Sequence, residues 1–416
     1  MMGPGLSLEQ APPLGAPLRF FLTAPLFLVA AGLLAALAPE WSSGPHAAVT
    51  LALTHLVTLG FLAMVMLGAL TQMLPVVAGA PVPAVGWIAR FSHGGLALGS
   101  AFLAWGLGTL APSALAAAGV LLGLGLGVFL LAGTLSVMRG RAIDTLRAMG
   151  LALAALAVTL ALGLGLGAWL AGLWQPDTPL DWLAGHVLAG LAGWIGLLIM
   201  GTAWQVVPML QLTPPYPAGL TRGLLVLTGA SLALALLPAS LAEASAVGQA
   251  GLALCAWIFA LATLDLQRRR KRKTADVALS FWRLGMVSLM LAALAFPLAD
   301  SERTSLLAGL LFLLGFAASV VCGMLYKIVP FLAWFHLQAQ QGLMAAGLPG
   351  MKDYLPDAAA RGQFRLHLVA LATLLLAPFA PALAVPGGLL LAGSAAWLGW
   401  NLLGVVRRFQ AHGGRF

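Results

Sequence analysis

The chain has 416 residues, of which 61% are hydrophobic and only 8% are charged, and its formal net charge is +9. A soluble domain carries roughly 25% charged residues, so this composition excludes a water-soluble globular protein. It predicts an all-α polytopic membrane protein, because each spanning helix needs about 20 apolar residues. The positive charge does not indicate nucleic-acid binding, since basic residues of membrane proteins collect in the cytoplasmic loops that fix topology.

Apolar runs separated by short polar connections predict twelve spans in one membrane domain of residues 1–416. We place the spans near residues 19–38, 49–76, 91–111, 114–137, 149–173, 183–207, 222–240, 247–266, 280–298, 305–330, 366–385 and 387–406. With a cytoplasmic N-terminus, all of the 21 Lys and Arg residues except Arg303 fall on the cytoplasmic side. The positive-inside rule therefore predicts that both termini are cytoplasmic, in a bacterial-type inner membrane.

Three other features have simple structural interpretations. Cys255 and Cys322 lie inside apolar spans, so neither a disulfide framework nor a zinc-type pair is expected. The two GLGLG strings at residues 123–127 and 163–167 resemble dinucleotide loops superficially, but inside spans they indicate small-residue faces where helices approach closely. The basic run at 268–273 is interpreted as a topology anchor, with binding of anionic lipid headgroups as the alternative.

Three spans share one pattern: a Gly and an aromatic residue, six residues, a second Gly, three residues, a Gln or Lys, two residues and a Pro. The matching segments are GFLAMVMLGALTQMLP from Gly60, GWIGLLIMGTAWQVVP from Gly193 and GFAASVVCGMLYKIVP from Gly315. They fall in the second, sixth and tenth spans, which predicts three four-helix units in a pseudo-threefold bundle. We expect the Gly residues to pack helices and the Pro residues to end them. The polar members are Gln72, Gln205 and Lys327, which reach toward the inner membrane surface.

The histidines divide by depth in the membrane. His55 and His186 lie about 6–9 Å below the outer surface at a rise of 1.5 Å per residue, on equivalent repeat spans. Ionisable residues inside spans are functional candidates, and two imidazoles from facing helices can supply both axial ligands of a heme. At 100° per residue, His55 shares its face with Met66 and His186 shares its face with Met200, so both methionines are candidate cofactor contacts. The alternative is that each histidine only bonds a neighbouring helix and the methionines fill the core.

A weaker candidate site lies near the inner surface. His93, His336 and His367 begin or follow spans there, and imidazole suits copper and iron. They are expected either to converge on copper or a second cofactor, or to be separate interfacial side chains.

The segment THLVTLGFLAMVMLGALTQMLPVVAGAP resembles the heme-ligand helix of the catalytic subunits of heme-copper oxidases and nitric oxide reductases. In that family a His near the outer end precedes a Gly, a polar residue and a Pro. The resemblance extends to twelve spans with both termini inside, and it implies that His55 stands where the family has a low-spin heme ligand.

The same resemblance argues against oxygen reduction. The family's other heme ligands lie on the tenth span, where this chain has Leu310 and Ala308, and the seventh span has no histidine for the family's copper site. The chain is instead similar to divergent non-oxidase relatives, such as the NnrS-type heme- and copper-containing membrane proteins linked to nitric oxide stress.

These observations predict a membrane protein that binds b-type heme and lacks an oxygen-reducing centre. Its expected role is electron transfer, a response to nitric oxide or another gas, or support of a respiratory complex, with lipid and respiratory-chain components as partners. Two other classes stay open: a transporter or metal-handling protein for copper or heme, and a cofactor-free assembly scaffold. No paired buried carboxylates, nucleotide loop or Ser-His-Asp set indicates an enzymatic reaction, and no catalytic residue is assigned.

Overall fold

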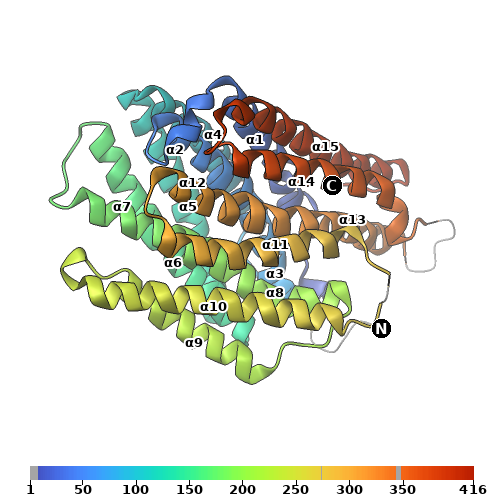
Figure 1. Ribbon diagram of the computed structural model, residues 1–416. Helices are drawn as coiled ribbons and strands as arrows, with labels where there is room; N and C mark the ends of the chain where they lie inside the picture. The colour runs from blue at the N-terminus through green and yellow to red at the C-terminus, as the bar shows by residue number, and fades with distance from the viewer. Residues whose placement is uncertain (1–7, 273, 343–347) are drawn as a thin grey trace.

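The computed structural model describes residues 8–272, 274–342 and 348–416 (Figure 1). These residues are mostly helical and contain no β-strand. Ten of the helices among them are long and apolar enough to cross a membrane. The chain is therefore an all-helical, multi-pass membrane protein.

The helices follow one another as three similar sets. The first set is α1 (Gly15–Leu37), α2 (Ala48–His55), η3 (Leu56–Ala63), α3 (Met64–Ala78), α4 (Val85–Thr109) and α5 (Pro112–Arg139). The second set is α6 (Asp144–Leu170), α7 (Pro179–Leu188), η4 (Ala189–Gly196), α8 (Leu197–Gln211), α9 (Ala218–Ala235) and α10 (Ala242–Arg268). The third set is α11 (Val277–Ala295), α12 (Glu302–Leu310), η7 (Leu311–Ala318), α13 (Ser319–Gln341), α14 (Asp357–Leu376) and α15 (Ala384–Ala411). Short 3-10 helices occupy the connections at Leu8–Gln10, Pro39–Ser43, Ala239–Leu241, Phe296–Leu298, Met351–Tyr354 and Pro381–Leu383.

Each predicted span overlaps a helix of this series. The eleventh span, predicted at 366–385, is shifted at both ends, because α14 begins at Asp357 and ends at Leu376. Its first turns carry Arg361 and Arg365, which a search for apolar residues leaves out, and Pro378 and Pro381 favour a break before the next helix. Helices α4 and α14 are not among the ten candidate spans.

Three continuous helix runs carry the sequence repeat: Ala48–Ala78, Pro179–Gln211 and Glu302–Gln341. We call them the repeat runs. Each contains an eight-residue π-helical segment, η3, η4 or η7. Each segment has the first repeat glycine, Gly60, Gly193 or Gly315, at its fifth position. The repeat in the sequence is therefore matched by the same departure from α-helical geometry. Such π-helical turns are rare in proteins overall, and those that occur are often at functional sites.

The repeat glycines pack each run against the first helix of its own set. A Cβ added at any of them would lie between 2.3 and 2.8 Å from an atom of that helix. The opposed pairs are Gly60 with Phe27 and Gly68 with Phe20 on α1, Gly193 with Ala155 and Gly201 with Ala148 on α6, and Gly315 with Ser288 and Gly323 with Phe281 on α11. Because real Cβ atoms essentially never approach so closely, the predicted packing role of these glycines is confirmed.

The prediction that the repeat prolines end their helices is wrong. Pro75, Pro208 and Pro330 all lie inside helices. Membrane helices tolerate proline where neighbouring groups satisfy the freed carbonyls. The first two runs end only at left-handed residues, Gly79 and Leu212, and the third continues to Gln341.

Neighbouring helices recur in the same order in the three sets. The first helix of each set packs on its repeat run, and the last two helices pack on each other, as α4 with α5, α9 with α10 and α14 with α15. Contacts of α5 with α6, α10 with α11 and α15 with α1 join the sets into a closed bundle. Gly32 and Gly388 allow α1 and α15 to touch, since a Cβ at Gly388 would lie 2.6 Å from the Gly32 carbonyl oxygen.

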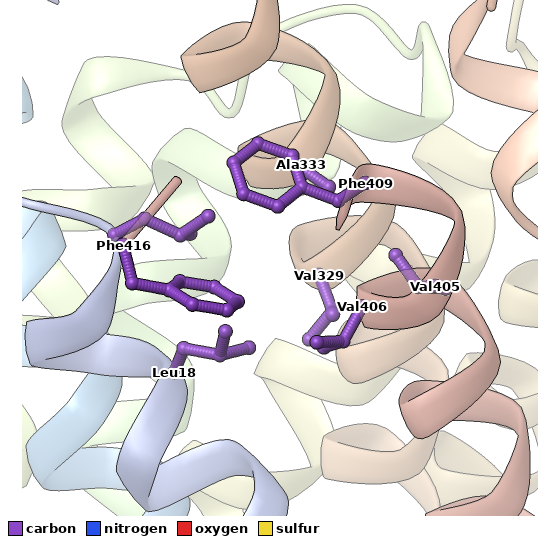
Figure 2. Close-up of a pocket in the computed structure, with 8 residues that line it drawn as sticks. Leu18, Val329, Ala333, Val405, Val406, Phe409 and Phe416 are labelled. Carbon is purple, nitrogen blue, oxygen red and sulfur yellow. The ribbon is translucent and has the colours of Figure 1, made fainter. Parts of the chain in front are cut away.

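Both ends of the described chain lie at one end of the bundle (Figure 1). His336 on α13 bonds the carbonyl of Pro12 through Nε2 at 3.1 Å. From the next turn of α13, Gln340 donates to the carbonyl of Arg415 at 2.7 Å. The Phe416 ring lies beside Leu18 and over a small apolar pocket (Figure 2). N- and C-terminal segments on the same side are what the predicted topology requires.

Candidate functional site

The structure brings together the two histidines that lie at similar depth in the sequence. His55 is the last residue of α2, directly before η3, and His186 lies in the last turn of α7, shortly before η4. Their ring centroids are 6.1 Å apart and their ring planes differ by 24°. The two rings come from the first and second repeat runs, so the pair forms only when the bundle assembles.

Each of the two rings is held through Nδ1 by a backbone carbonyl. His55 Nδ1 donates to the Leu51 carbonyl at 2.8 Å, and His186 Nδ1 donates to the Thr159 carbonyl of α6 at 2.9 Å. Because a carbonyl oxygen can only accept, Nδ1 carries the proton and Nε2 of each neutral ring keeps its lone pair. Metal-ligating histidines are nearly always oriented in this way. Both Nε2 atoms are therefore prepared to act as ligands.

Helix α6 is shaped around the His186 ring. A Cβ at Gly163 would lie 2.8 Å from Cε1 and 3.2 Å from Nδ1 of His186. Gly165 makes room in the same way for Trp182, whose ring would be 2.3 Å from an added Cβ, whereas Gly167 has nothing within 4 Å. The GLGLG string was predicted only as a helix-packing face, because spacing alone does not show which side chain opposes each glycine.

The two methionines predicted to share the histidine faces lie beyond the π-helical segments. A π-helical turn holds more residues than an α-helical turn, so the rotation per residue through η3 and η4 falls below 100° and the predicted faces shift. Met66 lines a cavity in the middle of the bundle, and Met200 is 5% exposed. Their contact with a cofactor stays a prediction.

The three inner histidines have separate partners in the structure. The contacts are His93 Nε2 with Thr23 Oγ1 at 2.9 Å, His336 Nε2 with the Pro12 carbonyl at 3.1 Å, and His367 Nε2 with Ser319 Oγ at 2.8 Å. Within the described parts of the chain, no three or more His, Cys, Asp or Glu side chains are grouped so that they could hold a metal ion. The structure does not bring these three histidines together.

The polar repeat residues differ in how they are satisfied. Lys327 Nζ donates to Asp276 Oδ2 at 2.8 Å, and Asp276 also caps α11 by accepting from the Leu279 N–H at 3.1 Å. Burial favours a higher pKa for Asp276, but the hydrogen bond and charge of Lys327, with the Leu279 N–H, outweigh it and lower that pKa. Gln72 is 8% exposed and its Oε1 has no partner among the described residues, while Gln205 is partly buried. Asp276 was not predicted as a partner of Lys327, because it lies three residues after the end of the basic run at 268–273.

Comparisons with protein-family models and with curated proteins gave no match for this chain. The ring separation of the histidine pair can be compared with that of two imidazoles on one metal ion. Imidazole nitrogens bind metal ions at about 2.0–2.1 Å, so two rings on opposite sides of one ion have centroids about 6 Å apart. The separation of 6.1 Å between His55 and His186 is close to this value.

Proposed function

We propose that this chain is a membrane protein that binds b-type heme through His55 and His186. The supporting observation is a pair of imidazoles, held through Nδ1 on different helices, with ring centroids 6.1 Å apart. Two histidines can hold a heme iron, and helix bundles build such sites from facing helices. A heme held in this way supplies one-electron transfer. The residues of this chain hold the two rings, fix their tautomers and keep them at one depth.

We also propose that the fold is a twelve-span, pseudo-threefold bundle of the heme-copper oxidase type, with cytoplasmic termini in a bacterial-type inner membrane. Three observations support this architecture: the π-helical segment at one position of each repeat run, the matched glycine contacts and the recurring order of neighbours. In this proposal α4 and α14 are the remaining two spans. Leu310 and Ala308 stand where the third repeat run would need histidines, so electron transfer, gas response or respiratory-complex support is favoured over oxygen reduction.

The absorption spectrum of the purified full chain, produced in heme-replete cells, tests this function. We expect the Soret and α bands of a bis-histidine heme in the reduced protein. His55→Ala and His186→Ala should each abolish them, while His412→Ala in the exposed tail should leave them unchanged. A colourless wild-type protein, or unaltered bands in both site variants, would reject the proposal.

The same ring separation also favours a second candidate, a copper-handling protein. A single cuprous ion between the two Nε2 atoms would give a similar distance, because imidazole binds copper as well as iron. Metal analysis would then find copper without heme, lost in His55→Ala, and a vesicle assay would detect its release by a transporter. Copper lost instead in His93→Ala or His367→Ala would indicate the inner histidines. Correctly folded protein with neither cofactor would favour the assembly scaffold.

A further inference from the structure

A cavity lies where residues of α3, α8 and α13 meet Trp282 of α11. Its volume is about 60 Å³. Its lining includes Ala69 of α3, Thr202 of α8, Trp282 of α11 and Met324 of α13. All three repeat runs contribute to it after their π-helical segments, whereas His55 and His186 precede those segments. The cavity is therefore separate from the histidine pair.

The lining of this cavity is mostly apolar. The Thr202 hydroxyl donates to the carbonyls of Leu198 at 2.8 Å and Ile199 at 3.1 Å in its own helix, so its proton is already used and only its oxygen lone pairs remain. The Trp282 indole N–H belongs to a side chain that is 1% exposed, and it has no partner among the described residues. A buried water needs roughly two to four polar partners. Apart from the Trp282 indole N–H and the Thr202 oxygen, the lining consists of apolar side chains, and apolar cavities take apolar ligands.

The size of the cavity limits the occupant. One water centre needs roughly 10–15 Å³, and this cavity holds about 60 Å³. That space suits a molecule of a few atoms. We infer that the cavity between the repeat runs binds one small, neutral, largely apolar molecule of the size of a dissolved gas. This inference does not depend on the proposed heme.

Xenon is the probe, because it is neutral, apolar and of suitable size. In ¹²⁹Xe exchange NMR of the full chain in lipid nanodiscs, we expect a protein-bound signal beside the lipid-dissolved one. Ala69→Leu fills the cavity and should abolish the bound signal, whereas Met324→Ala enlarges the cavity and should strengthen it. Ala101→Leu, the same substitution at an exposed position of α4, is the control and should give the bound signal of the wild type.

Two results would overturn the inference. One is the absence of a protein-bound xenon signal in the wild type. The other is a bound signal that neither Ala69→Leu nor Met324→Ala alters, because that signal would come from another site. The heme bands are recorded on the same samples, so xenon binding without heme would reject only the proposed function, and heme without xenon binding would reject only this inference.

Discussion

Gly163 provides the sharpest test of the histidine geometry, because changing it leaves both ligands in place. In Gly163→Ala the new Cβ would lie 2.8 Å from His186 Cε1, and ordinary contact begins near 3.4 Å. The ring must therefore retreat by the difference, about 0.6 Å. Thr159 lies on the same helix as Gly163, so this retreat lengthens the bond from Nδ1 to the Thr159 carbonyl from 2.9 Å toward 3.5 Å. At that distance little of the hydrogen bond remains.

Loss of this bond should weaken cofactor binding without removing a ligand. Changing such an orienting partner typically costs about 10–100-fold in metal affinity, which corresponds to roughly 1.4–2.8 kcal/mol. The assay is the rate of heme loss to an excess of a heme-scavenging protein, followed by absorbance. Gly167→Ala is the matched control on the same helix, because an added Cβ there has nothing within 4 Å. Equal heme retention by both variants would refute the idea that α6 positions the His186 ring.

Three further predictions concern packing, pH and topology. Gly388→Ala places a Cβ against the α1 backbone and should cost about 1–3 kcal/mol, lowering the thermal midpoint, whereas Gly127→Ala has open space and should not. The pKa of Asp276 is lowered in the folded state, so its charge stabilises the fold above the unfolded pKa near 4 and this effect is lost as the pH falls through the folded value. Asp276→Asn should therefore lower the melting temperature at pH 7, and an equal deficit at pH 3 would contradict this. Ala84→Cys and Thr109→Cys, at the two ends of α4, should react with an impermeant maleimide from opposite sides of the membrane, and labelling from one side would show that α4 does not cross.

Part of the candidate site follows from the sequence because depth in a membrane can be counted along a helix. Equivalent repeat positions place His55 and His186 at similar heights, and the structure places their rings 6.1 Å apart. The partners of the rings do not follow from the sequence. Thr159 and Gly163 belong to α6, and only the packed bundle determines which face of that helix meets His186.

The helix series was also largely predictable, because charged and polar residues interrupt the apolar runs at nearly every connection. The exception at α14 has a simple cause: the helix begins before the apolar region, in the segment that contains Arg361 and Arg365. The polar contact of Asp276 with Lys327 was not predictable, since it joins residues 51 apart in the chain. Contacts of that kind depend on which helices become neighbours.

The π-helical segments explain the spacing of the repeat glycines, and they shift the methionines away from the faces predicted at 100° per residue. The two glycines of each repeat are eight residues apart, as Gly60 and Gly68 are, but they oppose residues seven apart on the neighbouring helix, as Phe27 and Phe20 are. In an α-helix, residues seven apart share a face and an eighth residue turns the side chain about 100° away. A π-helical segment absorbs the additional residue, so both glycines face the same neighbour. The same adjustment rotates the chain before the segment, including His55, relative to the chain after it, including Met66. Each of the first two repeat runs thereby contributes one histidine to the pair of His55 and His186 and contributes its later residues to the central cavity.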